Sequence, residues 1–404
     1  MSLLAARILS ASGPGFLLLA GALLRVTLVL RAPDLSDDMF RYLWDGRVAA
    51  AGISPYAAAP RDPAVANLAP DLAPKVAHRD IVTVYPPVAQ AAFRVFGGAG
   101  RPVLWKAFAA AADLSVVALL WSSGGPGAGF AAALYAFHPL PVTEAAGEGH
   151  LDSLGVALLL ASLVHLTRPR RALAGVAFAM SVLTKYVSLA AAIPLLRRGR
   201  WKFAATAALS AAALWIAATK GGVSPAGGMR DYAERWEFNS PVYMGAFALM
   251  ERTELPRKAK EAFLSLKEEW NHPEWTRGVF PYFYSAFFAR AFLGLLLAAA
   301  LLVIGRRVGD LRASVFASLA ALLLLSPTLH PWYLLWVLPF AALRREPAFL
   351  YLSFVVPVSY ALLYPLSGVS CGIVSTAEFL PFAVLLTMTL ARRQMKNREL
   401  RTED

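Results

Sequence analysis

The sequence has few charged residues and a single cysteine. Charged side chains make up 16% of the 404 residues, whereas soluble domains carry roughly 25%. Cys371 has no second cysteine to pair with, so no disulfide forms within the chain. The first apolar stretch lacks a convincing small-residue cleavage site and is expected to persist as a helix. These features argue against a soluble domain and against a disulfide-stabilised scaffold.

Apolar residues are abundant instead. They account for 58% of the chain, and the mean hydropathy is +0.53. Long apolar runs repeat from Leu17 to Leu390. A helix of about 20 such residues crosses a hydrocarbon core roughly 30 Å thick. The sequence therefore predicts an all-α, multi-pass integral membrane protein that forms one membrane-embedded unit over residues 1–404.

The formal net charge of +13 comes from basic clusters in short segments between apolar runs. Cytoplasmic loops are enriched in Lys and Arg, so we expect these clusters on the cytoplasmic side. Nucleic-acid binding is not indicated, because no basic surface is interleaved with aromatic side chains that could stack on bases. The clusters are Arg168/Arg170/Arg171, Arg197/Arg198/Arg200/Lys202, Arg306/Arg307/Arg312, Arg344/Arg345 and the tail from Arg392 to Arg401.

Clusters on one side must be separated by an even number of crossings. This rule predicts helix breaks at 184–186 and 326–331, and prolines at Pro327 and Pro331 favour the second break. The result is roughly twelve membrane-spanning helices, with external loops at 33–102 and 220–279. The expected helices lie at about 15–31, 103–122, 127–143, 153–166, 172–183, 187–196, 203–219, 280–304, 313–325, 332–343, 347–364 and 376–391.

Two adjacent aspartates, Asp37 and Asp38, follow the first predicted helix. Acidic residues in a first helical turn are favourable there, so helix capping is one explanation. Arg41 and Asp45 follow at helical spacing, which favours a functional site over helix capping alone. Adjacent residues on a helix point about 100° apart, so one aspartate could act as a general base while the other caps the helix or holds a metal.

Ionisable residues recur at other predicted outer positions. Glu148, His150 and Asp152 fall within five residues; they could bind a metal or an acceptor, or lie in a solvated loop, and they fit no zinc template. Lys185 and His330 occupy the two predicted breaks. Ionisable groups near membrane depth are costly and usually functional, and either cation could neutralise a lipid phosphate, although Lys185 could also extend to the interface.

Aromatic residues accompany these groups. Tyr85 begins a Tyr-Pro-Pro segment that opens a helix too short to span, and Tyr333 follows Trp332, which is expected to anchor at the interface. The loop 220–279 contains Trp236 and Asn239, a combination suited to sugar binding. Residues 251–270 of that loop predict an amphipathic interfacial helix.

In this order the motifs resemble those of a known superfamily. They are Ser36-Asp37-Asp38-Met39-Phe40-Arg41-Tyr42-Leu43-Trp44-Asp45-Gly46-Arg47, a Gly-x-x-Pro-Tyr turn at 52–56, Tyr-Pro-Pro at 85–87, Thr-Lys-Tyr at 184–186 and His-Pro-Trp-Tyr at 330–333. The chain resembles the GT-C superfamily of integral-membrane glycosyltransferases from about Leu17 to Phe340. It looks most like bacterial polyprenyl-phosphate-mannose-dependent mannosyltransferases.

The resemblance implies a GT-C fold with extracytoplasmic juxtamembrane helices in a bacterial plasma membrane. It implies inverting transfer of a sugar, mannose in the nearest relatives, from a polyprenyl-phosphate donor to a glycan or glycolipid acceptor. The base would be an outer-loop aspartate, here Asp38 or Asp37. Asp38 is favoured because relatives often have a tyrosine four residues after the catalytic aspartate, and Tyr42 stands at that distance from Asp38.

These considerations assign a role to each candidate residue. Lys185, His330 and Arg41 are predicted to bind the donor phosphate. The sequence identifies no definite cofactor, and a divalent metal held by Asp37, Asp38 and Asp152 is left open. The predicted acceptor- or sugar-binding residues are Glu148, His150, Asp152, Tyr85, Trp236, Asn239 and Tyr333.

Two other classes of protein share much of this pattern. A transporter or flippase of lipid-linked sugars would show the same basic loops and outer polar cluster. It would also line a path to the inner face with charge, and it would commonly carry an internal repeat. Polar residues are few in the inner halves of the predicted helices and no repeat is visible, which favours the enzyme. A non-catalytic membrane assembly subunit is the third alternative.

Overall fold

The computed structural model describes residues 11–65, 67–125, 127–219, 222–270, 279, 282–363 and 370–402, without the side chains of 267–270 and 396–402. Within these residues every regular element is a helix, and strand-like pairing is limited to one isolated bridge between Phe238 and Thr328. The predicted all-α fold is confirmed. Part of the second predicted outer loop, 271–278, lies outside the described residues, as do the side chains at the end of the basic tail.

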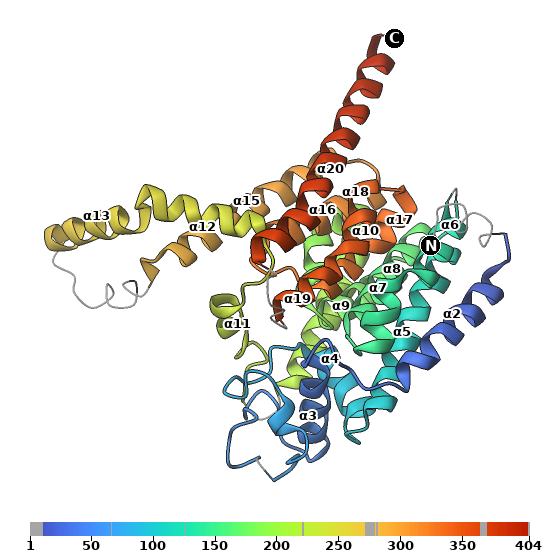
Figure 1. Cartoon of the computed structure of the whole chain (residues 1–404), viewed down its shortest axis with the longest axis horizontal. Helices are drawn as coiled ribbons and strands as arrows, with labels where there is room; N and C mark the ends of the chain where they lie inside the picture. Colours follow the sequence, from blue (N-terminus) through green and yellow to red (C-terminus); the bar gives the residue numbers. More distant parts are fainter. Residues whose placement is uncertain are drawn as a thin grey trace.

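The N-terminal half builds most of the helical bundle (Figure 1). Its helices are α2 Pro14–Val29, α3 Asp38–Ala50, η1 Ala73–Lys75, α4 Pro87–Ala92, η2 Phe93–Gly97, α5 Pro102–Ser122, α6 Ala128–Phe137, α7 Pro139–Pro141, η3 Val142–Gly147, α8 Asp152–Thr167, α9 Arg171–Val182, η4 Tyr186–Ala191 and α10 Ala192–Ala218.

The C-terminal half closes the bundle and contributes an arm. Its helices are α11 Met229–Arg235, α12 Pro241–Thr253, α13 Leu255–Trp270, α15 Ser285–Arg307, α16 Leu311–Leu325, η6 Pro331–Trp336, α17 Leu338–Arg344, α18 Pro347–Val355, η7 Val356–Ser359, α19 Tyr360–Leu363 and α20 Cys371–Thr402. In Figure 1, α12 and α13 extend away from the bundle, while α3 and α4 lie at the end opposite the tip of α20.

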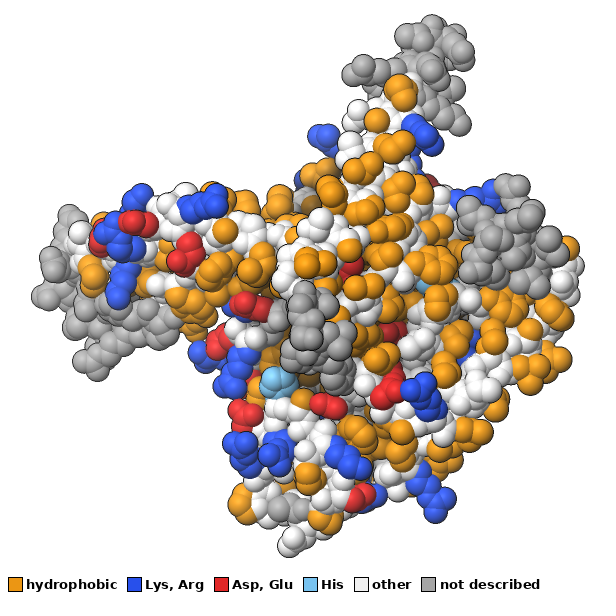
Figure 2. Space-filling view, in the orientation of Figure 1, with side chains coloured by type: hydrophobic (Ala, Val, Ile, Leu, Met, Phe, Trp, Pro, Cys, Tyr) orange, Lys and Arg blue, Asp and Glu red, His pale blue; other side chains and the backbone are white. Residues whose placement is uncertain are grey.

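Several helices are long and apolar enough to cross a membrane. Among the described residues these are Pro102–Ser122, Tyr186–Ala218, Ser285–Arg307 and Cys371–Met395, and the bent pair Pro139–Gly147 and Asp152–Thr167 adds a broken span with a 119° bend. Shorter apolar helices, including α2, α9 and α16, pack among them. Figure 2 shows hydrophobic side chains spread over α20, α15 and α2. The chain is a polytopic membrane protein, and the number of twelve crossings stays a prediction.

Both predicted helix breaks are present. Helix α9 ends at Val182 and η4 begins at Tyr186, so Lys185 lies between two helical pieces in extended backbone. Helix α16 ends at Leu325 and η6 begins at Pro331. The predicted continuous helix at 127–143 is wrong, because it is interrupted at His138. Pro139 removes a backbone donor and disfavours helical geometry in the residue before it.

The basic clusters meet at one end of the bundle. Arg168 and Arg312 both donate to backbone carbonyls at the C-terminal end of α5, at Ser122 and Ser123 respectively. Arg344 pairs with Asp310 and Arg393 with Glu346. Arg198 lines a cavity of about 300 Å³ together with Arg312. The structure thus gathers the clusters together, as one-sided placement requires.

A buried ion pair fixes α2 against the bundle. The Arg25 Nε atom donates to Asp113 Oδ2 of α5 at 2.8 Å, and both side chains are almost fully buried. Tyr135 and Ser153 donate to the other oxygen, Asp113 Oδ1, at 2.7 and 2.8 Å. A buried pair is tolerated when such additional hydrogen bonds satisfy it. Because Ser153 follows Asp152, this network anchors the start of α8 beside the site described next.

Candidate active site

A cavity of about 540 Å³ opens at the end of the bundle opposite the basic clusters. That volume lies within the range typical of small-molecule sites. Its wall is built from the start of α3, the segment before α4, the break before η4, helix α11 and the break before η6. Eight residues predicted from the sequence line it: Asp37, Asp38, Arg41, Tyr85, Lys185, Trp236, His330 and Tyr333.

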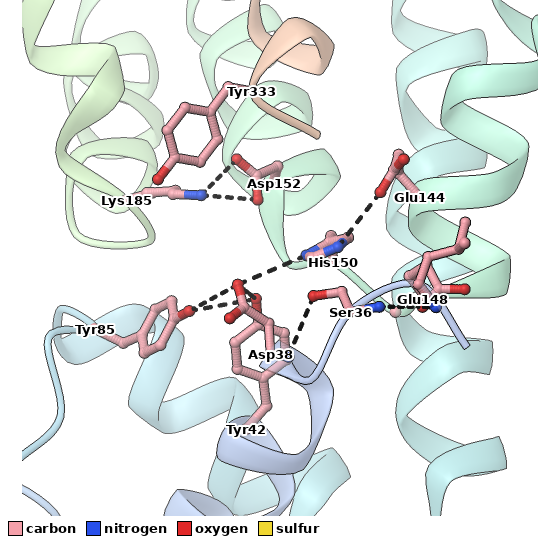
Figure 3. Close-up of polar contacts among 12 residues, drawn as sticks. Ser36, Asp38, Tyr42, Tyr85, Glu144, Glu148, His150, Asp152, Lys185 and Tyr333 are labelled. Carbon is pink, nitrogen blue, oxygen red and sulfur yellow. Dashed lines mark hydrogen bonds and ion pairs between the residues drawn. The ribbon is translucent and has the colours of Figure 1, made fainter. Parts of the chain in front are cut away.

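Asp38 lies at the first position of α3 and lines the cavity. Figure 3 shows its carboxylate pointing into the space between Tyr85, Lys185 and His150. Its Oδ2 atom accepts long hydrogen bonds from the hydroxyls of Tyr42 and Tyr85, both at 3.4 Å. About a third of the side chain, 35%, is exposed. This carboxylate is therefore held by two phenols while one side stays open to a ligand.

The surroundings of Asp38 change its acidity. Burial raises the pKa of the Asp38 carboxyl above its usual range, and the positive charge of Lys185 opposes that rise. Burial also raises the pKa of Tyr85 well above the usual value, so this phenol remains protonated and donates to the carboxylate. A carboxylate whose pKa is raised is a stronger base once ionised, which suits proton abstraction.

The backbone leading into α3 is held by a side chain that lies just before α8. The Glu148 carboxylate accepts from the backbone N–H groups of Leu35 and Ser36, both at 3.0 Å, and more weakly from Asp34. The Ser36 hydroxyl accepts from the Asp38 N–H at 3.3 Å. Behind Asp38, the Tyr42 ring stacks on Phe93 at 4.8 Å. These contacts fix the direction in which Asp38 points.

Asp37 lies beside Asp38 but has a different environment. It is the N-cap residue of α3, its side chain makes no capping hydrogen bond, and it is exposed at the cavity wall. The two aspartates thus differ in their surroundings, since Asp38 is bonded and partly buried whereas Asp37 is exposed and does not cap the helix with its side chain. Which of them acts as the base stays a prediction.

Lys185 projects from the break between α9 and η4 toward the cavity. Its Nζ atom donates to both oxygens of Asp152, at 2.8 and 3.0 Å, and lies 4.4 Å from the centre of the Tyr333 ring. Asp152 also accepts from the Trp336 indole at 2.7 Å. Asp152 is fully buried and Lys185 is 18% exposed, so the cation is the member of the pair that a ligand reaches.

Two further donors on the cavity wall have unused hydrogen-bonding capacity. Arg41 Nε donates to Asp45 at 2.8 Å, which leaves the buried Nη2 atom without a partner. The buried Nδ1 atom of His330 also has no partner. Unsatisfied buried polar atoms are costly. An anion in the cavity would accept from Arg41, and from His330 in the tautomer that carries its proton on Nδ1.

Aromatic side chains form the remaining wall. The Tyr232 and Tyr333 hydroxyls are 2.6 Å apart, and Trp236 packs against His78 with ring centres 4.3 Å apart. Tyr232, Trp236 and His78 all line the cavity. Aromatic faces beside polar groups are suited to covering the apolar side of a sugar ring.

The remaining predicted residues do not line the cavity. Glu148, His150 and Asp152 lie behind it, where they contact the α3 entry, Asp38 and Lys185 respectively. Asn239 lies elsewhere: its amide donates to Glu378 of α20 at 2.7 Å. This contact joins the loop before α12 to α20, so the structure does not bring Asn239 to the site.

Some residues at the site were not among the sequence candidates. Glu144 is fully buried beside His150, and Tyr360 donates to it at 2.9 Å. Tyr232 and His78 line the cavity. Glu144 carried a usable signal, because it is an ionisable residue at the end of an apolar run. Tyr232 lies in the aromatic loop 220–279 that the sequence already favours for sugar binding, whereas the contacts of His78 and Tyr360 depend on tertiary packing alone.

The suggested metal ligands are not assembled. Among the residues that the structure describes, no group of three or more His, Cys, Asp or Glu side chains is arranged to hold a metal ion. Asp152 is bonded instead to Lys185 and Trp336. The structure thus does not bring Asp37, Asp38 and Asp152 together as a ligand set.

The fold is that of a polytopic membrane protein in which a carboxylate, Asp38, and a cation, Lys185, line one cavity. Residues 83–327 match glycosyltransferase family 87, and residues 285–392 match the MptB C-terminal domain. The first match covers more than half of the chain, which therefore belongs to glycosyltransferase family 87. No curated protein and no solved structure matches the chain. The match supports the predicted resemblance and favours the enzyme over the transporter.

Proposed function

We propose that the protein moves a sugar, mannose, from a polyprenyl-phosphate donor to a glycan or glycolipid acceptor, with inversion at the anomeric carbon, on the extracytoplasmic face of a bacterial plasma membrane. The observation that carries the proposal is that Asp38, a carboxylate suited to act as a base, and Lys185, a cation suited to hold phosphate, open on one cavity. Asp38 would take the proton of the acceptor hydroxyl, and Lys185 would neutralise the charge of the departing phosphate.

Asp38 takes the proton from the acceptor hydroxyl. The acceptor oxygen forms a bond to the anomeric carbon while the bond from that carbon to the phosphate oxygen breaks. A single displacement of this kind inverts the anomeric centre. Tyr42 and Tyr85 hold the carboxylate in place for the transfer, and positioned general-base catalysis contributes about 10²–10⁴-fold.

Lys185 stabilises the departing phosphate, with Arg41 and His330 as additional donors. Charge develops on the phosphate oxygen as the bond to the sugar breaks, so groups already oriented toward it lower the barrier. The Asp152 carboxylate and Tyr333 ring hold Lys185 in place before the donor arrives.

The wall of the cavity fits a lipid-linked donor. Leu322 and Leu323 of α16 and Leu363 of α19 line the cavity together with the ionisable groups. A polyprenyl chain requires an apolar surface next to a phosphate site, which a water-soluble donor does not. Mannose as the sugar rests on the resemblance to the mannosyltransferases and on the MptB match.

The distribution of charge supports the proposed sidedness. Helix α8 starts at Asp152, beside the site, and its 16 residues end at Thr167, next to the basic cluster of Arg168. That length corresponds to roughly 24 Å, most of a hydrocarbon core. Since basic loops favour the cytoplasm, the cavity faces outward in this proposal.

The test is a transfer assay with purified protein in liposomes. Radiolabelled polyprenyl-phosphate mannose is supplied with candidate lipid and glycan acceptors, and the anomeric configuration of the product is determined. We expect label to move to an acceptor with inverted configuration. Transfer from a nucleotide sugar instead, or movement of the intact donor between leaflets without transfer, would contradict the proposal.

A further inference from the structure

His150 lies between Asp38 and a second buried carboxyl group, that of Glu144. Its Nδ1 atom is 3.9 Å from Asp38 Oδ2, and its Nε2 atom is 3.4 Å from Glu144 Oε2 (Figure 3). His150 and Glu144 are both fully buried. Both distances exceed that of a formed hydrogen bond, but hydrogen bonds that act in catalysis are often long before substrate binds. The ring thus presents one nitrogen to each carboxyl group.

The position of the His150 ring is fixed on several sides. The ring stacks on Trp332 with ring centres 3.9 Å apart, and the His150 backbone N–H donates to the Glu144 carbonyl at 2.8 Å. The preceding residue, Gly149, has a φ of 76°, and a Cβ added there would lie 3.1 Å from Trp105. These contacts hold the ring in the orientation that turns one nitrogen to each carboxyl group.

Glu144 is buried without a neighbouring positive charge. Among the residues that the structure describes, no cation pairs with its carboxyl group, whose contacts are the Tyr360 hydroxyl at 2.9 Å and the His150 ring. An isolated carboxylate is very costly to bury, so Glu144 carries a proton at neutral pH. Burial, together with the positive charge of Lys185, lowers the pKa of His150 well below its usual range. A neutral acid and a neutral imidazole therefore face each other.

The contacts of Glu144 decide which of its oxygens carries the proton. Glu144 Oε1 is buried and has no hydrogen-bond partner among the described residues, so a proton there would be an unsatisfied buried donor. A proton on Oε2 meets an acceptor, His150 Nε2, while Oε2 still accepts from Tyr360. The proton is therefore best placed on Oε2.

The other ring nitrogen faces a negative charge. With Nε2 accepting from Glu144, the single proton of a neutral His150 ring lies on Nδ1, which is the nitrogen that faces Asp38. The opposite tautomer would turn a lone pair of Nδ1 toward the Asp38 carboxylate, an unfavourable arrangement. The contacts on the two sides of the ring thus favour the same tautomer.

We propose that Glu144 acts as a neutral hydrogen-bond donor that fixes the tautomer of His150, and that His150 in turn donates from Nδ1 to Oδ2 of Asp38. The proposal rests on the proposed function of Asp38 as base. It makes His150 and Glu144 positioning residues, which act on the reaction through Asp38. No proton is transferred along this chain.

This arrangement gives the two oxygens of Asp38 different roles. The hydroxyls of Tyr42 and Tyr85 both donate to Oδ2, and Nδ1 of His150 faces the same atom. Three donors around Oδ2 hold the carboxylate in one orientation and stabilise its charge. Oδ1, to which no described residue donates, is left to take the proton of the acceptor hydroxyl.

The tautomer is measured directly by solid-state NMR of the full chain in liposomes. Isotope-labelled histidine distinguishes a protonated from an unprotonated ring nitrogen, and the His150 signals are assigned by their loss in His150→Asn. We expect a proton on Nδ1 and none on Nε2, both in the wild type and in Glu144→Gln, whose amide also donates. In Glu144→Leu, which has no donor, we expect the second tautomer to appear.

Transfer assays show whether these hydrogen bonds contribute to the reaction. Glu144→Gln and His150→Asn keep a donor in place, since the asparagine amide nitrogen lies near the position of Nδ1, whereas Glu144→Leu and His150→Leu remove it. We expect kcat to fall by about 10–10²-fold in the leucine variants, the value of one hydrogen bond to a charged group, and to stay within about 3-fold of wild type in the amide variants. KM for the donor should change little, because neither residue lines the cavity.

Control variants separate this effect from a loss of packing. His138→Leu and Glu346→Leu make the same changes at equally buried residues away from the cavity, and they should lower thermal stability without lowering kcat per folded molecule. The double variant His150→Asn/Glu144→Leu should be as active as His150→Asn, because an amide has no tautomer to fix and groups that act as a unit are not additive.

Four results would overturn the proposal. They are a proton on Nε2 of His150 in the wild type, an unchanged tautomer in Glu144→Leu, equal losses of kcat in Glu144→Gln and Glu144→Leu, and a further loss in the double variant. If a leucine variant does not fold, the spectra of the wild type and Glu144→Gln still decide. Because NMR needs no turnover, the tautomer is tested separately from the proposed function, which fails alone if the wild type transfers no sugar.

Discussion

Asp38→Asn is expected to lower the rate of sugar transfer by about 10²–10⁴-fold, the contribution of a positioned general base. The amide keeps the shape of the carboxylate and can still accept from Tyr42 and Tyr85, but it cannot take a proton. Transfer is measured as kcat for labelled donor, with substrate binding measured separately. Donor binding should be nearly unchanged, because the lost interaction belongs to the transition state.

Asp37→Asn is the matched control, since it makes the same change at the adjacent residue. Its loss of transfer rate should be much smaller, because Asp37 is exposed and makes no capping bond.

The stability of Asp38→Asn gives a second check. The pKa of Asp38 is raised in the folded protein, so ionisation costs stability above that pKa, and Asp38→Asn should be at least as stable as wild type at neutral pH. Full transfer activity of Asp38→Asn would show that Asp38 is not the general base.

Lys185→Met is expected to weaken donor binding and to lower kcat. Together these effects should lower kcat/KM by about 10²–10³-fold, which is the typical loss when a preorganised group that stabilises transition-state charge is removed. Methionine retains much of the apolar stem but no charge. Lys202→Met, at the basic end of the bundle, is the control and should leave transfer unchanged. Because the variant leaves Asp152 buried without its cation, Lys185→Met/Asp152→Asn provides a second form if the single variant does not fold.

The same variant should change the pH dependence in a defined direction. The positive charge of Lys185 lowers the pKa of Asp38, whereas the negative charge of Asp152 raises it. The base is active when ionised, so activity is lost as pH falls through its pKa. Removing Lys185 raises that pKa, and the acidic limb of kcat/KM should move to higher pH. An acidic limb that stays in place or moves to lower pH would show that Lys185 does not act on the base.

Positions fixed by membrane topology could be predicted from the sequence. Basic loops on one side require an even number of crossings, and that counting rule placed the breaks at Lys185 and at 326–331, where the structure has them. The same rule placed the ionisable residues at the end of the bundle away from the basic clusters. Both results depend on the cost of charge in the hydrocarbon core.

The roles of individual polar residues could not be predicted in this way. Glu148 and His150 are separated by one residue, yet Glu148 binds the backbone before α3 whereas His150 faces Asp38. The π-helical turn of η3 and the positive φ of Gly149 determine which way each side chain points. The loop containing Asn239 looked suitable for sugar binding, but α20, distant in the sequence, supplies its partner Glu378.

The proposed function depends most on the face to which the cavity opens, because a cytoplasmic site would meet nucleotide sugars rather than an outer-leaflet lipid donor. Single cysteines in a Cys371→Ser background report this directly. Ala57→Cys lies in the exposed loop on the cavity side, and Gly309→Cys lies at the basic end, where an added Cβ meets no neighbour. A membrane-impermeant maleimide should label Ala57→Cys on intact bacterial cells and Gly309→Cys only after permeabilisation. Labelling of Gly309→Cys on intact cells, with Ala57→Cys protected, would contradict the account.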